Sequence, residues 1–166
     1  MNAAIAIVAA VAIERGGELL YSARNTRALR ARGAVEAGRR HYPLIVLLHA
    51  AWLACLIIFL PRPVSLRWSW LASFAALQIL RIWVLASLGP YWTTRIVTLK
   101  DAPLVRRGPY RFLRHPNYVI VVGEIASLPL AFGETGVAIV FSVLNAAMLW
   151  WRIAAEEKVL SVRRSL

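Results

Sequence analysis

One short segment, GPYRFLRHPNYVIVVGE, concentrates polar side chains that could bind a ligand directly before an apolar run. Within it, Tyr110 precedes a block formed by His115, Pro116, Asn117 and Tyr118. Proline suits the first turn of a helix, where its missing N–H costs nothing, so Pro116 predicts a helix start. We therefore expect a polar site at the cytosolic end of a membrane-spanning helix.

A second polar cluster, RIAAEE, closes a later apolar run. Arg152 and Glu156 are four residues apart and share one helix face, whereas the adjacent Glu157 points about 100° away. A helix-end ion pair would explain Arg152 and Glu156 by themselves. If both clusters lie at one membrane depth, however, cationic, acidic and aromatic groups converge there. Such a site suits a small ligand that carries both charges, with a lipid bound beside it.

The composition indicates an integral membrane protein. Of the 166 residues, 60% are hydrophobic and 7 are Trp, compared with about 45–50% apolar residues in soluble domains. The net charge of +12 is carried mostly between apolar runs, as in cytosolic loops near anionic lipid, so we do not expect nucleic-acid binding. The single cysteine, Cys55, permits no intrachain disulfide, and the three scattered histidines do not predict a metal site.

The apolar runs predict an all-α fold with five transmembrane helices, over residues 3–20, 42–60, 68–88, 118–132 and 137–151. The last two are short and separated by Gly-Glu-Thr-Gly, which predicts a C-terminal helical hairpin. The basic stretch 21–41 reads as an interfacial helix and turn, and the TTRIVT stretch as a short strand or turn. We treat residues 1–166 as a single domain, with three N-terminal spans in 1–88 and the ligand site in 89–166.

The basic segments also predict the orientation. Residues 21–41, residues 89–117 and the C-terminal tail hold most of the Lys and Arg. Five spans place all three on the cytosolic side, with the N-terminus outside, whereas four spans would put the basic tail on the wrong side. The predicted ligand pocket then faces the cytosol.

Several polar residues fall inside the predicted spans. Glu14, Arg15 and Glu18 lie in the first span, where ionisable groups are usually either functional or paired. Arg81 interrupts the third span. We interpret His49, in the second span, as a hydrogen-bonded core histidine.

Four motifs of the C-terminal half resemble those of the isoprenylcysteine carboxyl methyltransferase family. They are Leu104-Val105, Gly108-x-Tyr110, Arg114-His115-Pro116-x-Tyr118 and Arg152-Ile153-x-x-Glu156-Glu157-x-x-Leu160. Phospholipid N-methyltransferases are similar over the same region. Two positions depart from the family pattern. Ile120 stands where members often have Gly, and Ala102 stands where members that act on prenylated proteins usually have His.

The resemblance implies S-adenosylmethionine as the cofactor. It also implies the cofactor-binding residues, which are Leu104, Val105, Tyr110, His115, Pro116, Asn117, Tyr118, Glu156 and Glu157. By the same resemblance, Arg152 matches the arginine that meets the methyl acceptor. The N-terminal half resembles small bacterial members, several of which are similar to enzymes that methylate alkylpyrones and alkylresorcinols. We therefore expect a bacterial inner-membrane enzyme with a lipidic acceptor.

Methyl transfer from a sulfonium mainly requires positioning and desolvation of the reactants. Arg152 can hold an ionised carboxylate or hydroxypyrone oxygen, whereas a resorcinol would need a base, for which Glu124 is the nearest candidate. An equally weighted interpretation pairs Glu124 with Arg81 or Arg15. Two other functions stay open. One is a phospholipid N-methyltransferase, whose amine acceptor has little use for Arg152. The other is a non-catalytic lipid-binding scaffold or transporter subunit, which would bind no cofactor.

Overall fold

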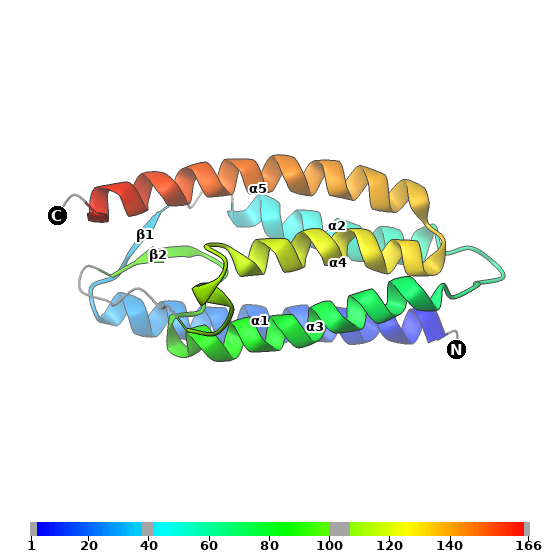
Figure 1. The fold of residues 1–166 in the computed structure, drawn as a ribbon, viewed down its shortest axis with the longest axis horizontal. Helices are drawn as coiled ribbons and strands as arrows, with labels where there is room; N and C mark the ends of the chain where they lie inside the picture. The colour runs from blue at the N-terminus through cyan, green and yellow to red at the C-terminus, as the bar shows by residue number, and fades with distance from the viewer. Residues whose placement is uncertain (1–2, 38–41, 100–106, 165–166) are drawn as a thin grey trace.

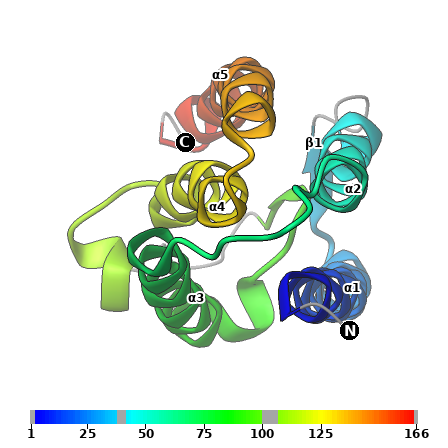
Figure 2. The same cartoon turned by 90° about the vertical axis from the view of Figure 1, so that its right-hand side faces the viewer.

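The computed structural model describes residues 3–37, 42–99 and 107–164, and the side chains of 157–164 lie outside this description. Within these residues, five α-helices form an elongated bundle with a small sheet at one end (Figure 1). Viewed along its length, α3, α4, α5, α2 and α1 follow one another around the bundle (Figure 2). The N-terminus lies at one end, and the C-terminus lies beside the sheet at the other.

Helix α1 (Ala3–Ala31) runs further than the sequence predicted. The helix and turn expected over residues 21–41 are present, but the helix is the unbroken continuation of α1 to Ala31 rather than a separate element, and the turn at Arg32 and Gly33 leads into a strand that was not foreseen. No Gly or Pro interrupts the chain between Leu20 and Ala31, and Gly33, with φ +86°, is the first residue in a left-handed conformation. A buried stripe holds the extension against the rest of the fold and consists of Ser22, Asn25, Thr26 and Leu29.

The sheet is a two-stranded antiparallel ladder of β1 (Val35–Ala37) and β2 (Ile96–Thr98), in which Glu36 pairs with Val97. The short strand expected in TTRIVT is therefore confirmed, whereas its partner β1 was not foreseen. Glu36 is buried and forms ion pairs with Arg30 and Arg95. The all-α prediction needs this correction, although the fold is otherwise helical.

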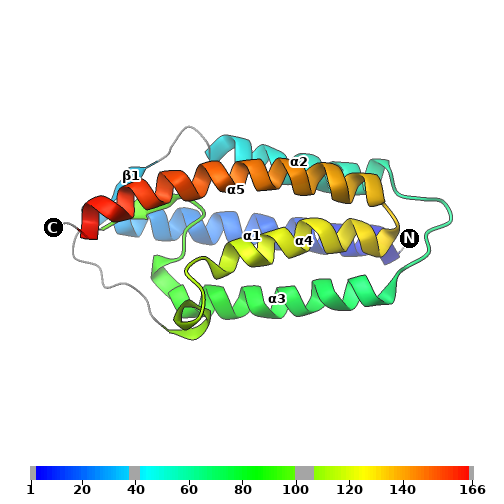
Figure 3. The ribbon, with the colours of Figure 1, turned by 45° about the horizontal axis from the view of Figure 1, so that its top comes forward.

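The predicted C-terminal hairpin is confirmed. Helix α4 (Pro116–Phe132) begins with proline in its first turn, as expected, and α5 (Thr135–Arg164) returns antiparallel to it (Figure 3). Gly133 makes the connection with φ +84°, and its N–H caps α4 by donating to the Leu130 carbonyl. Helix α5 continues well beyond the predicted span of residues 137–151, so Arg152 and Glu156 lie on continuous helix, as their spacing predicted.

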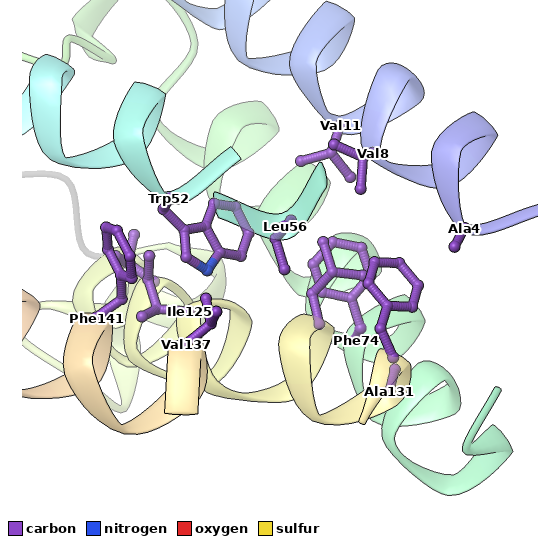
Figure 4. Packing of buried hydrophobic residues seen from close by; sticks show 13 residues of the cluster. Ala4, Val8, Val11, Trp52, Leu56, Phe74, Ile125, Ala131, Val137 and Phe141 are labelled. Atoms are coloured by element: carbon purple, nitrogen blue, oxygen red, sulfur yellow. The ribbon is translucent and has the colours of Figure 1, made fainter. Parts of the chain in front are cut away.

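Aromatic and aliphatic side chains from all five helices fill the half of the bundle away from the sheet (Figure 4). Trp52 and Leu56 of α2 (Tyr42–Ile58) meet Phe74 of α3 (Trp68–Leu88) and Phe141 of α5 in one buried cluster. This cluster fixes how α2, α3 and α5 lie against one another. It therefore also fixes how they carry polar residues toward the sheet end.

Two helical segments of the described chain, Trp68–Tyr91 and Thr135–Glu156, are long and apolar enough to cross a membrane. Helices α2 and α4 are apolar but shorter. Large apolar side chains also point outward along the bundle, including Ile79, Ile82, Val143 and Trp150. Extended apolar patches on a protein surface usually mark contact with a membrane or a partner.

Candidate active site

The hydroxyl of Tyr118 links α4 to α5 at the sheet end of the bundle. It accepts a hydrogen bond of 2.8 Å from Nε of Arg152 and donates one to the Glu156 carboxylate. The sequence predicted that Arg152 and Glu156 share a helix face, and both do meet the same hydroxyl. Nη2 of Arg152 also donates to the backbone carbonyl of Thr94, at 2.8 Å. The guanidinium is therefore held in place from two elements.

His115 and Tyr110 complete the surroundings of Glu156. The His115 ring stacks on Tyr118 with centroids 5.1 Å apart, and its Nδ1 lies 3.7 Å from the Glu156 carboxylate. Burial, and secondarily the negative charge of Glu156, raises the pKa of Tyr110, so its phenol keeps its proton and can donate. Of the predicted convergence of an arginine, a carboxylate pair, a histidine and two tyrosines, all groups except the second carboxylate, Glu157, are present, and the Glu157 side chain lies outside the described residues.

The glycine of the Gly108-x-Tyr110 motif has a steric role. A Cβ at Gly108 would stand 2.1 Å from Oγ of Ser87, and φ is +58°, which disfavours other residues. This close approach seats the short helix η2 (Gly108–Arg111) against α3, where Arg107 donates to the Ser87 carbonyl. Tyr110 is thereby fixed near Glu156.

The loop of residues 92–94 is a functional element that the sequence analysis missed. Asn25 of α1 donates to the Trp92 carbonyl at 2.8 Å, and Ser22 accepts from the Thr94 N–H. The Thr94 hydroxyl also donates to Tyr42 of α2. Because Thr94 meets Arg152 through its backbone, no side-chain pattern could have identified it. The buried polar stripe on α1 was the available signal.

Two cavities meet at the Arg152–Tyr118 pair. The larger, of about 320 Å³, lies among α1, α2, α4 and α5, and the smaller, of about 170 Å³, lies beside the sheet. Asn117, Tyr118 and Arg152 line both, whereas Glu156 lines only the smaller one. The Oδ1 atom of Asn117 is buried without a hydrogen-bond partner in the described part of the chain. This geometry can hold two ligands with their reacting ends together.

Glu124 lies deeper in the bundle, in a cluster of ion pairs. Its carboxylate accepts hydrogen bonds from Arg81, with Nε at 2.9 Å, and from Arg15 at 3.2 Å. Glu18 bridges the same two arginines, and Gln78 donates to Glu14 beside them. The pairing of Glu124 with Arg81 and Arg15, an alternative in the sequence analysis, is therefore confirmed. Glu124 does not line either cavity.

The remaining predicted site residues divide into two groups. Pro116 is buried in the first turn of α4. Leu104 and Val105 lie outside the described residues, as does the side chain of Glu157. The predicted hydrogen bond of His49 is confirmed, since its Nδ1 lies 2.9 Å from the Ile45 carbonyl.

The described structure is thus a helical bundle with an Arg–Tyr–Glu cluster between a polar and a mainly apolar cavity. Residues 70–162 match the model of the isoprenylcysteine carboxyl methyltransferase (ICMT) family, and the chain belongs to this family. Membership implies a methyltransferase.

Two relatives show that the similarity extends beyond the matched region. The uncharacterized protein YpbQ of Bacillus subtilis is 35% identical over 158 residues, which cover 93% of this chain and 94% of YpbQ. An uncharacterized protein of Haemophilus influenzae is 28% identical over 86% of both chains. No solved structure gives a significant match.

Proposed function

We propose that this protein transfers the methyl group of S-adenosylmethionine to an oxygen of a lipidic acceptor at the membrane. The observation that carries the proposal is the placement of Tyr118 and Arg152 on the shared wall of the two cavities. A polar cofactor in the smaller cavity and an apolar acceptor in the larger one would meet at this wall. Family membership supports the methyl transfer itself.

The smaller cavity fits the polar groups of the cofactor, which supplies a methyl group activated on a sulfonium. Glu156 can bind an ammonium or ribose hydroxyls, and the unpartnered Oδ1 of Asn117 can accept a further hydrogen bond. Tyr110 and His115 flank Glu156. The other residues implied by the resemblance, Leu104, Val105, Pro116 and Glu157, stay in the proposal on that ground.

Arg152 is the residue that we assign to the acceptor oxygen. Its guanidinium reaches both cavities and is already oriented by Tyr118 and Thr94, so it can bind an anion without first being ordered. A carboxylate or an acidic hydroxyl arrives ionised and needs no base. We therefore assign Glu124, whose oxygens face Arg81 and Arg15, to holding the bundle together.

The two alternatives predict different binding. A phospholipid amine would meet the cationic Arg152 in the acceptor position, which disfavours N-methylation. A lipid-binding scaffold would not bind the cofactor. Titration of the detergent-purified protein with S-adenosylmethionine, followed by methyl transfer to a long-chain alkylpyrone, a prenylcysteine and a phosphatidylethanolamine, separates the three functions.

Cofactor affinity should depend on His115 and Glu156. Loss of one hydrogen bond to a charged group costs about 1.5–3 kcal/mol, so His115→Ala or Glu156→Ala should weaken binding roughly 10- to 150-fold. Isothermal titration with S-adenosylmethionine measures this. Arg111→Ala is the matched control, since Arg111 lies in the same segment but is exposed beside Phe112. Unchanged affinity in both folded variants would remove these residues from the site.

We also propose that all five helices span the membrane, with the sheet end of the bundle in the cytosol. The apolar outward-facing residues and the basic residues around the sheet end support this arrangement. Reporter fusions after Val64 and at the C-terminus should report opposite sides of the bacterial inner membrane. Reports from the same side would contradict five spans.

A further inference from the structure

The larger cavity continues from Arg152 toward the middle of the bundle, where two polar side chains line it. Asn145 of α5 is only 2% exposed, and its amide nitrogen is buried without a hydrogen-bond partner in the described part of the chain. His49 of α2 hydrogen-bonds through Nδ1 to the Ile45 carbonyl. Because a carbonyl can only accept, Nδ1 donates, and Nε2 of the neutral ring is an acceptor. The methyl-transfer site as described uses neither residue.

His49 and Asn145 lie at the same depth. Helices α2 and α5 run antiparallel (Figure 3), and Thr94 hydrogen-bonds to both Tyr42 of α2 and Arg152 of α5. His49 follows Tyr42 by seven residues, and Asn145 precedes Arg152 by seven. Seven residues of helix span about 10 Å.

The packing deeper in the bundle supports this alignment of α2 with α5. Trp52 lies three residues after His49, and Phe141 lies four residues before Asn145. Both belong to the buried cluster, where they lie close together in Figure 4. His49 and Asn145 therefore flank the cavity just before the core closes it.

The charged groups of α1 and α3 that line the cavity already bond to one another, so they do not compete with His49 and Asn145 for a ligand. Arg15 and Glu18 of α1 and Arg81 of α3 also line the cavity. They are bonded to one another and to Glu124 of α4. By contrast, the Asn145 amide can donate and His49 Nε2 can accept. One hydroxyl has the chemistry to bond to both, since its oxygen can accept from Asn145 while its hydrogen is donated to His49.

We propose that His49 and Asn145 bind a hydroxyl carried by the acceptor about two helical turns deeper in the bundle than its reacting oxygen, since Asn145 precedes Arg152 by seven residues. The acceptor class is then an oxygenated long-chain amphiphile rather than a plain prenyl or alkyl chain. This inference rests on the proposed function, because Arg152 defines where the reacting oxygen lies.

The test compares two fatty acids that can both place a carboxylate at Arg152. Hexadecanoate has a plain chain, and its analogue hydroxylated at the eighth carbon carries the hydroxyl seven carbon–carbon bonds from the carboxylate, a length close to the axial rise of two helical turns. Calorimetric titration of the detergent-purified full chain should show the hydroxylated acid binding about 10-fold more tightly. An isomer hydroxylated near the chain terminus should bind like the plain acid.

Asn145→Leu and His49→Leu should each remove most of this preference while leaving the affinity for the plain acid within about 2-fold, since only the contacts to the hydroxyl are lost. Ser142→Ala is the matched control, because Ser142 lies on α5 but lines neither cavity. Equal binding of the two acids by the wild type, no binding of either, or a preference that persists in both leucine variants would overturn the inference.

The proposed function is measured separately, by cofactor titration and methyl transfer. A chain that binds the cofactor and methylates an acceptor, yet shows no hydroxyl preference, would overturn this inference and keep the proposed function. A chain that shows the preference but binds no cofactor would overturn the proposed function, and with it the assignment of the bound molecule as a methyl acceptor, while His49 and Asn145 would remain a hydroxyl-binding pair.

Discussion

Arg152→Ala is expected to leave the affinity for S-adenosylmethionine nearly unchanged and to reduce methyl-transfer turnover by about 100- to 1000-fold. The reason is its position, since the guanidinium lines both cavities and is oriented by Tyr118 and the Thr94 carbonyl. Its loss would remove the group that holds the acceptor oxygen in line with the methyl group. Single-turnover methyl transfer to a long-chain alkylpyrone, measured beside calorimetric cofactor titration, checks both parts.

Arg152→Lys is the conservative control and should restore activity only in part, because an ammonium lacks the planar fork that engages Tyr118 and Thr94 together. Thermal unfolding of each variant in detergent tests for structural damage. A structural ion pair would instead give a modest loss of stability with near-normal turnover. Full activity of folded Arg152→Ala would end its assignment to the acceptor.

Glu124→Ala should be among the most destabilising single substitutions in this chain, with a cost of about 3–5 kcal/mol. Its removal leaves Arg81, which is 3% exposed, without the carboxylate that it contacts through two nitrogens. Arg15 loses a partner as well. Thermal unfolding in detergent measures the effect, and Glu36→Ala, which leaves the more exposed Arg30 and Arg95, should cost less.

The double variant Arg81→Met/Glu124→Leu tests whether the unpaired charge of Arg81 causes the destabilisation expected for Glu124→Ala. Removing both partners takes away the unpaired charge and should recover much of the lost stability, while Arg15 and Glu18 keep each other as partners. The variant Glu124→Gln distinguishes a structural role of Glu124 from a role as the catalytic base. If this variant folds normally and binds the cofactor but loses turnover, Glu124 acts as a base, contrary to our assignment.

The sequence by itself determined most of the local structure. Apolar runs placed the helices, Pro116 began α4, and Gly133 allowed the turn between α4 and α5. The four-residue spacing of Arg152 and Glu156 put both side chains on one face of α5. These are properties of a chain segment and its immediate neighbours, so periodicity and special residues suffice to predict them.

Tertiary structure decided which groups meet. Tyr118 and Arg152 are 34 residues apart, and Arg152 and the Thr94 carbonyl are 58 apart. Such contacts depend on loop paths and helix packing, and a backbone carbonyl leaves no trace in the residue pattern. The pairing of Glu124 was one of two interpretations until α1 and α3 brought Arg15 and Arg81 to it. His49 and Asn145 gained significance only when antiparallel packing set them at one depth beside the same cavity.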